Sequence, residues 1–205
     1  MDPLRAALSQ FVPRDDREAR DVARLRAGFD RGDVWSRDLA LHATASALVV
    51  HPPTRRVLLR HHTRMGGWFQ VGGHGDPGET DPWAIAVREA EEETGLRDLR
   101  APFPALDRRL VQVVIVPVPA ARDEPEHEHA DLRYLLATDT PDAVRAEAPE
   151  APVRWFTLPE ARDVVHEPNL RAFLDRTQAM LDQPDAFLLA SPTHRPTHDP
   201  EEHPA

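Results

Sequence analysis

Apolar residues along this chain follow two spacings, which together predict an α/β protein. Short apolar or aromatic stretches bounded by Gly or Pro indicate strands. The stretch at residues 110–118 is apolar on both faces, so we expect a strand in the middle of a sheet, ended by Pro117 and Pro119. Strands are expected at residues 42–50, 56–61, 68–71, 110–118, 132–137 and 153–157, the first two as a hairpin.

Apolar residues three or four positions apart predict helices on either side of these strands. The first begins at Asp15 or Asp16 and ends within residues 28–32. Its single apolar stripe consists of Ala19, Val22, Leu25 and Phe29. We expect this helix to pack on its own domain, with contact to a second copy in a homodimer as the alternative. Further helices are expected at residues 158–165 and 168–181.

The clearest helix prediction covers residues 82–94. Asp81 is a good N-cap, Pro82 fits the first helical position, and Gly95 suits the left-handed residue just past a helix end. At about 100° per residue, the helix has one acidic face and one apolar face. The acidic face carries Glu89, Glu92 and Glu93, and the opposite face carries Trp83, Val87 and Ala90.

The acidic face is unfavourable for an isolated helix. Glu89 and Glu93 repel each other one turn apart, and anions near the C-terminal end oppose the helix dipole, at a cost of about 0.3–1 kcal/mol each. Mg²⁺ or Mn²⁺ would reverse this effect, because hard dications bind carboxylate and carbonyl oxygens. A glutamate run on its own is more often a solvated surface, so the neighbouring residues decide between the two interpretations.

A glycine-rich turn precedes the helix and favours the metal site. Its glycines allow backbone carbonyls and amides to come close to a metal or phosphate. Glu79 ends the turn, and Arg88 lies four residues before Glu92, where it can hold a carboxylate in an ion pair. Together these residues resemble the Nudix box, which here reads Gly73, Glu79, Arg88, Glu89, Ala90, Glu92, Glu93, Gly95 and Leu96.

The sequence departs from the Nudix pattern in two places. Residues 80–87 form a gap between Glu79 and Arg88 that is one residue longer than usual, which puts the role of Glu79 in doubt more than the helix register. Val71 stands where the family often has proline. The chain contains no cysteine, which disfavours isopentenyl diphosphate isomerases, relatives of the family that rely on one.

The resemblance implies an α/β/α sandwich with a mixed β-sheet over residues 40–165. It also implies that Glu92 and Glu93 bind Mg²⁺ or Mn²⁺ with a backbone carbonyl of Gly72 or Gly73. Glu89 is then a metal ligand or the base that activates water, Arg88 orients the carboxylates, and Glu79 acts through a metal-bound water. The implied reaction is attack of water on phosphorus in a diphosphate that links a nucleoside to another moiety. A Nudix-like module that binds a nucleotide or metabolite without cleaving it is the alternative.

A second candidate region for function follows residue 120. In an extended chain His127, His129 and Asp131 point to one side, where they could supply ligands or an acid/base group. An acidic loop that is merely solvated is an equal alternative. Carboxylates of this loop, Glu124, Glu126 and Glu128, are rivals to Glu89 as the general base. Weaker candidates for substrate binding are Arg60, Arg64, His127, Glu128 and His129.

Length, charge and composition limit the domain organisation and the kinds of partner that we expect for this chain. A chain of 205 residues suits one core, and we divide it into an N-terminal extension (1–39), a Nudix domain (40–165), a C-terminal helix (166–190) and a disordered tail (191–205). The net charge of -10 argues against nucleic-acid binding. The absence of cysteine and of a long apolar segment predicts a cytoplasmic protein without membrane contact that acts on a small molecule.

Overall fold

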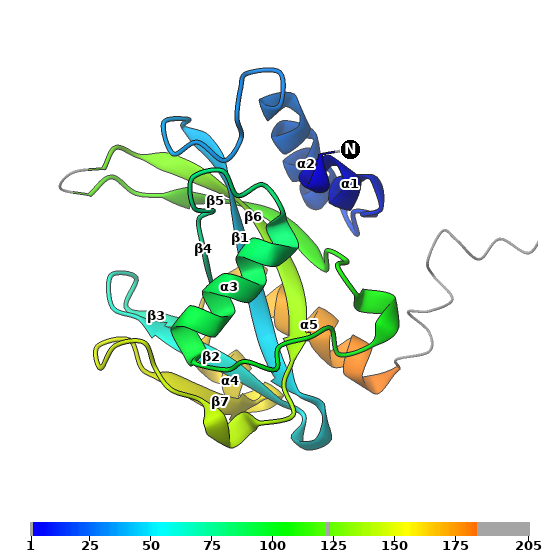
Figure 1. The fold of residues 1–205 in the computed structure, drawn as a ribbon, viewed down its shortest axis with the longest axis vertical. Coiled ribbons are helices and arrows are strands. Elements are labelled where there is room, and N and C mark those ends of the chain that lie inside the picture. Colours follow the sequence, from blue (N-terminus) through cyan, green and yellow to red (C-terminus); the bar gives the residue numbers. More distant parts are fainter. Residues whose placement is uncertain (1, 122–123, 184–205) are drawn as a thin grey trace, which may run out of the picture.

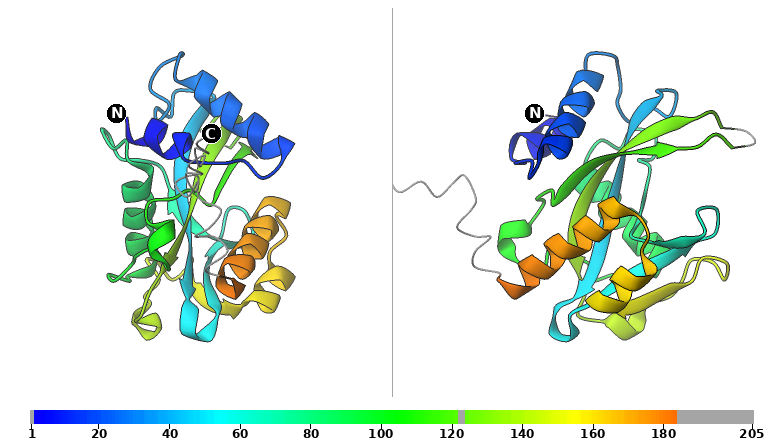
Figure 2. Two further views of the ribbon diagram at one scale, coloured as in Figure 1. Left: turned by 90° about the vertical axis from the view of Figure 1, so that its right-hand side faces the viewer. Right: turned by 180° about the vertical axis from the view of Figure 1, so that it is seen from behind.

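The computed structural model describes residues 2–121 and 124–183 of the chain. It shows one mixed sheet between helices, as the sequence predicted (Figures 1 and 2). The strands are β1 (Leu41–His51), β2 (Arg56–His62), β3 (Gly67–Phe69), β4 (Val71–Gly73), β5 (Gln112–Val118), β6 (His127–Ala137) and β7 (Val153–Thr157). The helices are α1 (Pro3–Ser9), α2 (Asp16–Gly28), α3 (Pro82–Thr94), α4 (Leu158–Val164) and α5 (Pro168–Asp182).

The sheet is built around β1, whose interior residues are buried on both faces. Its strand order is β3-β2-β1-β6-β5, with β4 also pairing with β1 and β7 with β2. The β1–β6 pair is parallel and the other pairs are antiparallel, so the sheet is mixed. As a result, the ends of β1 and β6 that carry Leu41 and Glu128 lie side by side.

Two apolar layers cover the sheet. Helix α3 packs on one face together with α1 and α2, and its Ile85, Ala86 and Ala90 are fully buried there. Helices α4 and α5 pack on the other face, where Phe156 and Phe173 are buried. The left view of Figure 2 shows α3 and α5 on opposite sides of the sheet. Of the apolar face predicted for α3, Ala90 is fully buried, whereas Trp83 and Val87 are partly buried against the same core.

The predicted position of the 110–118 strand was wrong, because β5 is an edge strand. Its outer edge is covered by α2, so the first half of the strand is buried although it has one strand neighbour. The backbone N–H of Val113 donates to Oε1 of Glu18 at 3.2 Å, and that of Ile115 donates to Oδ2 of Asp21 at 3.1 Å. Arg176 of α5 neutralises Glu18 at 2.6 Å. Helix α2 thus packs on its own domain.

Other differences have equally local causes. The stretch at 68–71 divides into β3 and β4, because the first pairs with β2 and the second with β1. Strand β6 begins at His127 and not at residue 132, since its parallel register with β1 extends from Glu128 to Ala137. Helix α1 had no predicted counterpart. The predicted tail at 191–205 and residues 184–190 of the predicted C-terminal segment lie outside the described residues.

Candidate active site

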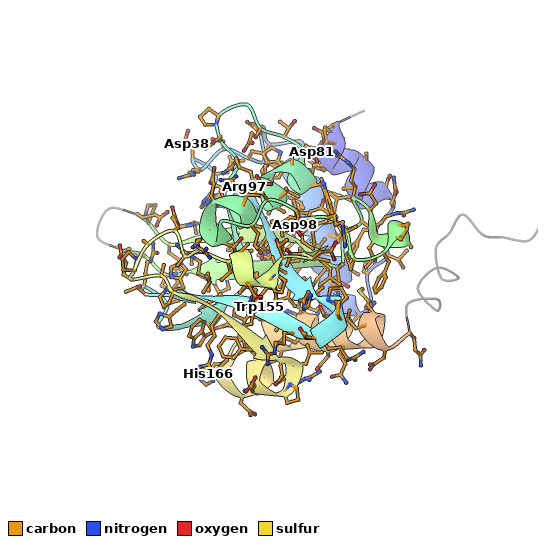
Figure 3. The ribbon with its side chains drawn as sticks, turned by 60° about the horizontal axis from the view of Figure 1, so that its bottom comes forward. Asp38, Asp81, Arg97, Asp98, Trp155 and His166 are labelled. Carbon is orange, nitrogen blue, oxygen red and sulfur yellow. The ribbon has the colours of Figure 1, made fainter. Side chains whose placement is uncertain are left out.

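Helix α3 begins and ends where the sequence predicted, and this fixes the direction of its acidic face. The side chain of Asp81 accepts hydrogen bonds from the backbone N–H groups of Trp83 and Ala84. Gly95 closes the helix in the left-handed conformation, with φ of 70°. Figure 3 labels Asp81 and Arg97 at the two ends of this helix. On the buried face, Trp83 contacts the ring of Tyr134 edge-on, at 5.3 Å between centroids.

Arg88 is the centre of the acidic face. Its guanidinium contacts Glu79 at 2.9 Å, Glu89 at 3.0 Å and Glu92 at 3.0 Å. It also donates to the backbone carbonyl of His74 at 2.9 Å. The longer gap after Glu79 is therefore absorbed within the turn, because Glu79 still reaches the helix. The arginine fixes three carboxylates and the preceding turn in one arrangement.

Two glycines of the turn are required by close packing. Gly72 has φ of 144°, and a Cβ there would lie 2.4 Å from Cα of Ser46 on β1. A Cβ on Gly73 would lie 2.7 Å from Oε2 of Glu89. The carboxylate of Glu89 thus rests directly against the backbone of the turn, and burial raises its pKa. A larger residue at Gly72 would force the turn away from β1, and one at Gly73 would force it away from α3.

Glu93 is the most buried carboxylate of the acidic face, with 8% of the residue exposed. It accepts a hydrogen bond from the backbone N–H of Gly72 at 2.9 Å and forms an ion pair with Arg60 at 3.2 Å. Burial nevertheless raises the pKa of Glu93 to about 7. Arg60, a predicted substrate residue, thus faces Glu93 and also pairs with Glu147 at 3.3 Å.

The acidic face suits Mg²⁺ or Mn²⁺ in the kind of ligand that it offers. Glu89 and Glu93 are carboxylates whose pKa values are raised by burial, and a dication would stabilise their charged form. The side chain of Glu92 is 53% exposed at the rim. The carboxylate oxygens of Glu89, Glu92 and Glu93 do not all lie within 4.8 Å of one another. Among the described residues, the group of three or more ligand atoms within 4.8 Å of one another belongs to His42, His74 and His129.

A pocket of about 620 Å³ lies next to the turn, where Gly72, Gly73 and His74 line it, and none of the carboxylates of the acidic face does. Of the predicted substrate residues, Arg64, His127 and His129 line it, whereas Arg60 does not. Glu128 also lies outside the pocket, on the other side of β6, where it binds Arg24 at 2.6 Å. Among the rival general bases, Glu124 lines the pocket and pairs with Arg64 at 3.1 Å.

The polar floor of the pocket was largely missed by the sequence analysis. Asp131 accepts hydrogen bonds from Ser46 at 3.0 Å, Gln70 at 3.1 Å and Arg133 at 2.7 Å. The sequence signal that could have predicted this floor is the alternation of polar residues with alanine in β1. The observed register with β6 pairs Thr44 with Asp131 and Ser46 with Arg133. Polar side chains of two parallel strands therefore line the same side of the sheet.

Next to this polar floor, the register between β1 and β6 places His42 opposite His129. His74 and His127 complete the group. Burial lowers the pKa of His74 to about 3 and that of His129 to about 4, so both rings are neutral at physiological pH. The sequence had indicated His127 and His129 as neighbours on one side of the strand, but it gave no reason to add His42 and His74.

Comparison with known proteins identifies the family. A model of the NUDIX domain matches residues 40–177. The chain belongs to the Nudix family. It is 32% identical over 111 residues to a protein of Lactococcus lactis named probable DHNTP pyrophosphohydrolase, a match that covers 53% of this chain and 61% of that protein. The chain therefore spans less than two thirds of the length of this Nudix relative.

Solved structures support the Nudix fold. The structure resembles a C. elegans Ap4A hydrolase in a binary complex, with a TM-score of 0.54 and 20% identity over 68% of this chain and 97% of the other. It also resembles the E. coli dihydroneopterin triphosphate pyrophosphohydrolase, with a TM-score of 0.50 and 17% identity over 65% and 92% of the two chains.

In the part of the chain that the structure describes, no helix is long and apolar enough to cross a membrane.

Proposed function

We propose that this Nudix protein is a metal-dependent pyrophosphohydrolase. Its substrate would be a nucleoside diphosphate linked to another moiety, or a close chemical analogue, and water would attack one phosphorus of the diphosphate. The observation that carries the proposal is the arrangement around Arg88, which holds Glu79, Glu89 and Glu92 and binds the backbone carbonyl of His74, a residue that lines the pocket. The name of the Lactococcus lactis relative agrees with this class of reaction.

The oxygen ligands of the proposed metal are Glu89, Glu92 and Glu93, with the backbone carbonyl of Gly72 or Gly73. A bound Mg²⁺ or Mn²⁺ would neutralise charge on the phosphoryl oxygens and lower the pKa of the attacking water. Arg88 would keep the carboxylates in position without contacting the substrate. Arg64, at the pocket wall, is our candidate to bind a phosphate.

Glu89 is our candidate for the general base. Its side chain is only 16% exposed, and its raised pKa makes it a better proton acceptor than an ordinary solvated carboxylate. Glu124 remains the rival, because it lines the pocket, whereas Glu89 lies behind Gly73 of the pocket wall. Glu126 is exposed, and Glu128 is held by Arg24 away from the pocket, which disfavours both.

The polar floor favours a substrate with a hydrogen-bonding heterocycle. Asp131 and Gln70 offer both acceptors and donors, as the edge of a purine or pterin ring requires. Small-molecule substrates are therefore proposed, and a homodimer and a cytoplasmic location stay predictions.

A substrate panel tests the proposal. Dihydroneopterin triphosphate, dinucleoside polyphosphates, nucleotide sugars, NADH and ADP-ribose would each be incubated with Mg²⁺ or Mn²⁺, and release of phosphate, diphosphate or monophosphate would be measured. We expect turnover of at least one compound, abolished by EDTA and by Glu89→Gln. Binding by calorimetry without turnover of any compound would contradict hydrolysis and support the sensing module.

A further inference from the structure

Four histidine side chains meet at one place in the sheet, and the proposed hydrolysis does not require their rings. His42 comes from β1, His74 from the turn after β4, and His127 and His129 from β6. The ring centroid of His42 lies 5.1 Å from that of His74, 5.2 Å from that of His127 and 4.9 Å from that of His129. We call this group the histidine cluster. Apolar residues would fill the same space without the cost of burying polar rings.

Backbone carbonyls fix the proton positions of two of these rings. Nδ1 of His42 lies 2.8 Å from the carbonyl oxygen of Leu39, and Nδ1 of His127 lies 2.8 Å from that of Pro125. A carbonyl oxygen only accepts, so each Nδ1 carries the proton and each Nε2 presents a lone pair. Such a bond on the far side of the ring is how proteins orient metal-binding imidazoles.

The Nε2 lone pairs of His42 and His127 each face a nitrogen of another imidazole ring. Nε2 of His42 lies 3.0 Å from Nε2 of His74, and Nε2 of His127 lies 3.0 Å from Nε2 of His129. His129 therefore donates from Nε2 to His127, which leaves a lone pair on Nδ1 of His129. Each ring thus has a nitrogen to offer, and none needs to be charged.

The nitrogens also converge across these pairs, which hydrogen bonding within each pair does not require. One ligand atom each of His42, His74 and His129 lies within 4.8 Å of the others. In a tetrahedral zinc site with Zn–N bonds of about 2.0–2.1 Å, ligand nitrogens are roughly 3.3–3.4 Å apart. The cluster is therefore close to coordination geometry, and side-chain rotation needs to shorten its widest separation, at most 4.8 Å, by no more than roughly 1.5 Å.

We propose that His42, His74 and His129 bind Zn²⁺, with His127 as the hydrogen-bond partner that orients His129. Imidazole favours zinc and similar transition metals, whereas Mg²⁺ prefers oxygen ligands. The metal would replace the proton shared by His42 and His74, and that proton would move to Nδ1 of His74, so both rings stay neutral. Three protein ligands leave a fourth position, and it would face the pocket that His74 and His129 line.

Metal analysis of the untagged, full-length protein tests this proposal. The protein would be purified without chelators, its metal content measured by plasma mass spectrometry, and its zinc affinity measured against a chromophoric chelator. We expect about one zinc per chain and, after replacement by cobalt, the intense visible absorption of a tetrahedral site. His42→Gln and His74→Gln should each weaken zinc binding at least about 100-fold, since even outer-shell changes cost 10–100-fold.

Two control variants separate the cluster from other histidines. His166→Gln removes an exposed histidine, labelled in Figure 3, and should leave zinc binding unchanged. A variant with His194, His198 and His203 all changed to Gln should also retain one zinc. Zinc that is lost in this last variant, or that persists in both His42→Gln and His74→Gln, would overturn the proposal.

A third control separates zinc binding from hydrolysis and from misfolding. Glu93→Gln should keep its zinc while losing activity with Mg²⁺, so each proposal can fail alone. Circular dichroism would establish that every variant is folded. His74 is partly exposed on a turn, so His74→Gln provides the test even where the buried His42→Gln does not fold.

Discussion

The acidic face of α3 and the histidine cluster lie on either side of one turn, yet they gather metal ligands in opposite ways. The glutamates are anionic, come from one helix and are held by Arg60 and Arg88. The histidines are neutral, come from three segments, and two of them are held by backbone carbonyls. One region suits a hard dication and the other a transition metal. The difference in ligand type would direct different metals to the two regions.

The largest effect should come from Glu89→Gln, which removes both a proposed metal ligand and the proposed base. We expect kcat to fall by about 10²–10⁴. Steady-state kinetics on the best substrate of the panel would measure it. Glu91→Gln on the same helix is the matched control, because Glu91 pairs only with the exposed Arg97. Activity within a few-fold of wild type in Glu89→Gln would shift the role of base to Glu124.

Arg88→Lys should loosen the acidic face while leaving the histidine cluster intact. A lysine cannot contact three carboxylates and a carbonyl at once, so the free energy of unfolding should fall by about 1–3 kcal/mol. Urea unfolding would measure the change, with Arg97→Lys as a surface control. Unaltered stability would mean that the ion pairs around Arg88 contribute little to the fold.

The two metals should stabilise the protein independently. Each should raise the free energy of unfolding by about 2.7 kcal/mol at a concentration 100 times its Kd. Glu93→Gln should remove the effect of Mg²⁺ alone, and His42→Gln that of Zn²⁺ alone. Thermal unfolding with each metal would show this, and loss of both effects in one variant would mean that the two regions form a single site.

Glu93 should also make stability depend on pH. Its folded-state pKa is raised from 4.5 to about 7, so the buried carboxylate costs nothing below pH 4.5 and destabilises the fold increasingly as pH rises towards 7. In the absence of divalent metal, Glu93→Gln should therefore be more stable than wild type by about 1–3 kcal/mol at pH 8, with little difference at pH 4.5. Urea unfolding at both pH values would measure it. An equal difference at both would contradict the raised pKa.

The smallest effect should come from Glu128→Gln. It breaks an ion pair with Arg24 in which both side chains are at least 35% exposed, and such pairs contribute about 0.2–1 kcal/mol. Turnover should not change, because Glu128 lies outside the pocket. A large loss of kcat would restore Glu128 as a general base.

The difference between the two regions also explains what the sequence could reveal. The acidic face depends on spacing within one helix and on local caps at Asp81 and Gly95, so it was predicted with its boundaries. The histidine cluster depends on the register between β1 and β6, which are far apart in the chain. Until that register is known, His42 has no visible partner.

The fold shows the same limit. The apolar pattern located β5 within two residues of its observed start, but a strand that is buried by a helix looks the same in sequence as a strand buried by other strands. Only the contacts of Glu18 and Asp21 with its backbone distinguish the two. Likewise, the start of β6 carries no apolar signal, because His127, His129 and Asp131 face the pocket and Glu128 pairs with Arg24 on the other side.

The contacts of α2 with β5 have a further consequence for how the protein behaves in solution. The carboxylates of Glu18 and Asp21 occupy N–H groups that could otherwise pair with a strand of another molecule. Deleting residues 2–28 would expose the outer edge of β5 and would leave Arg176 without its ion-pair partner Glu18. Helix α2 thus covers a strand edge that could otherwise pair with another molecule, and we expect a chain without residues 2–28 to self-associate more readily than the intact chain.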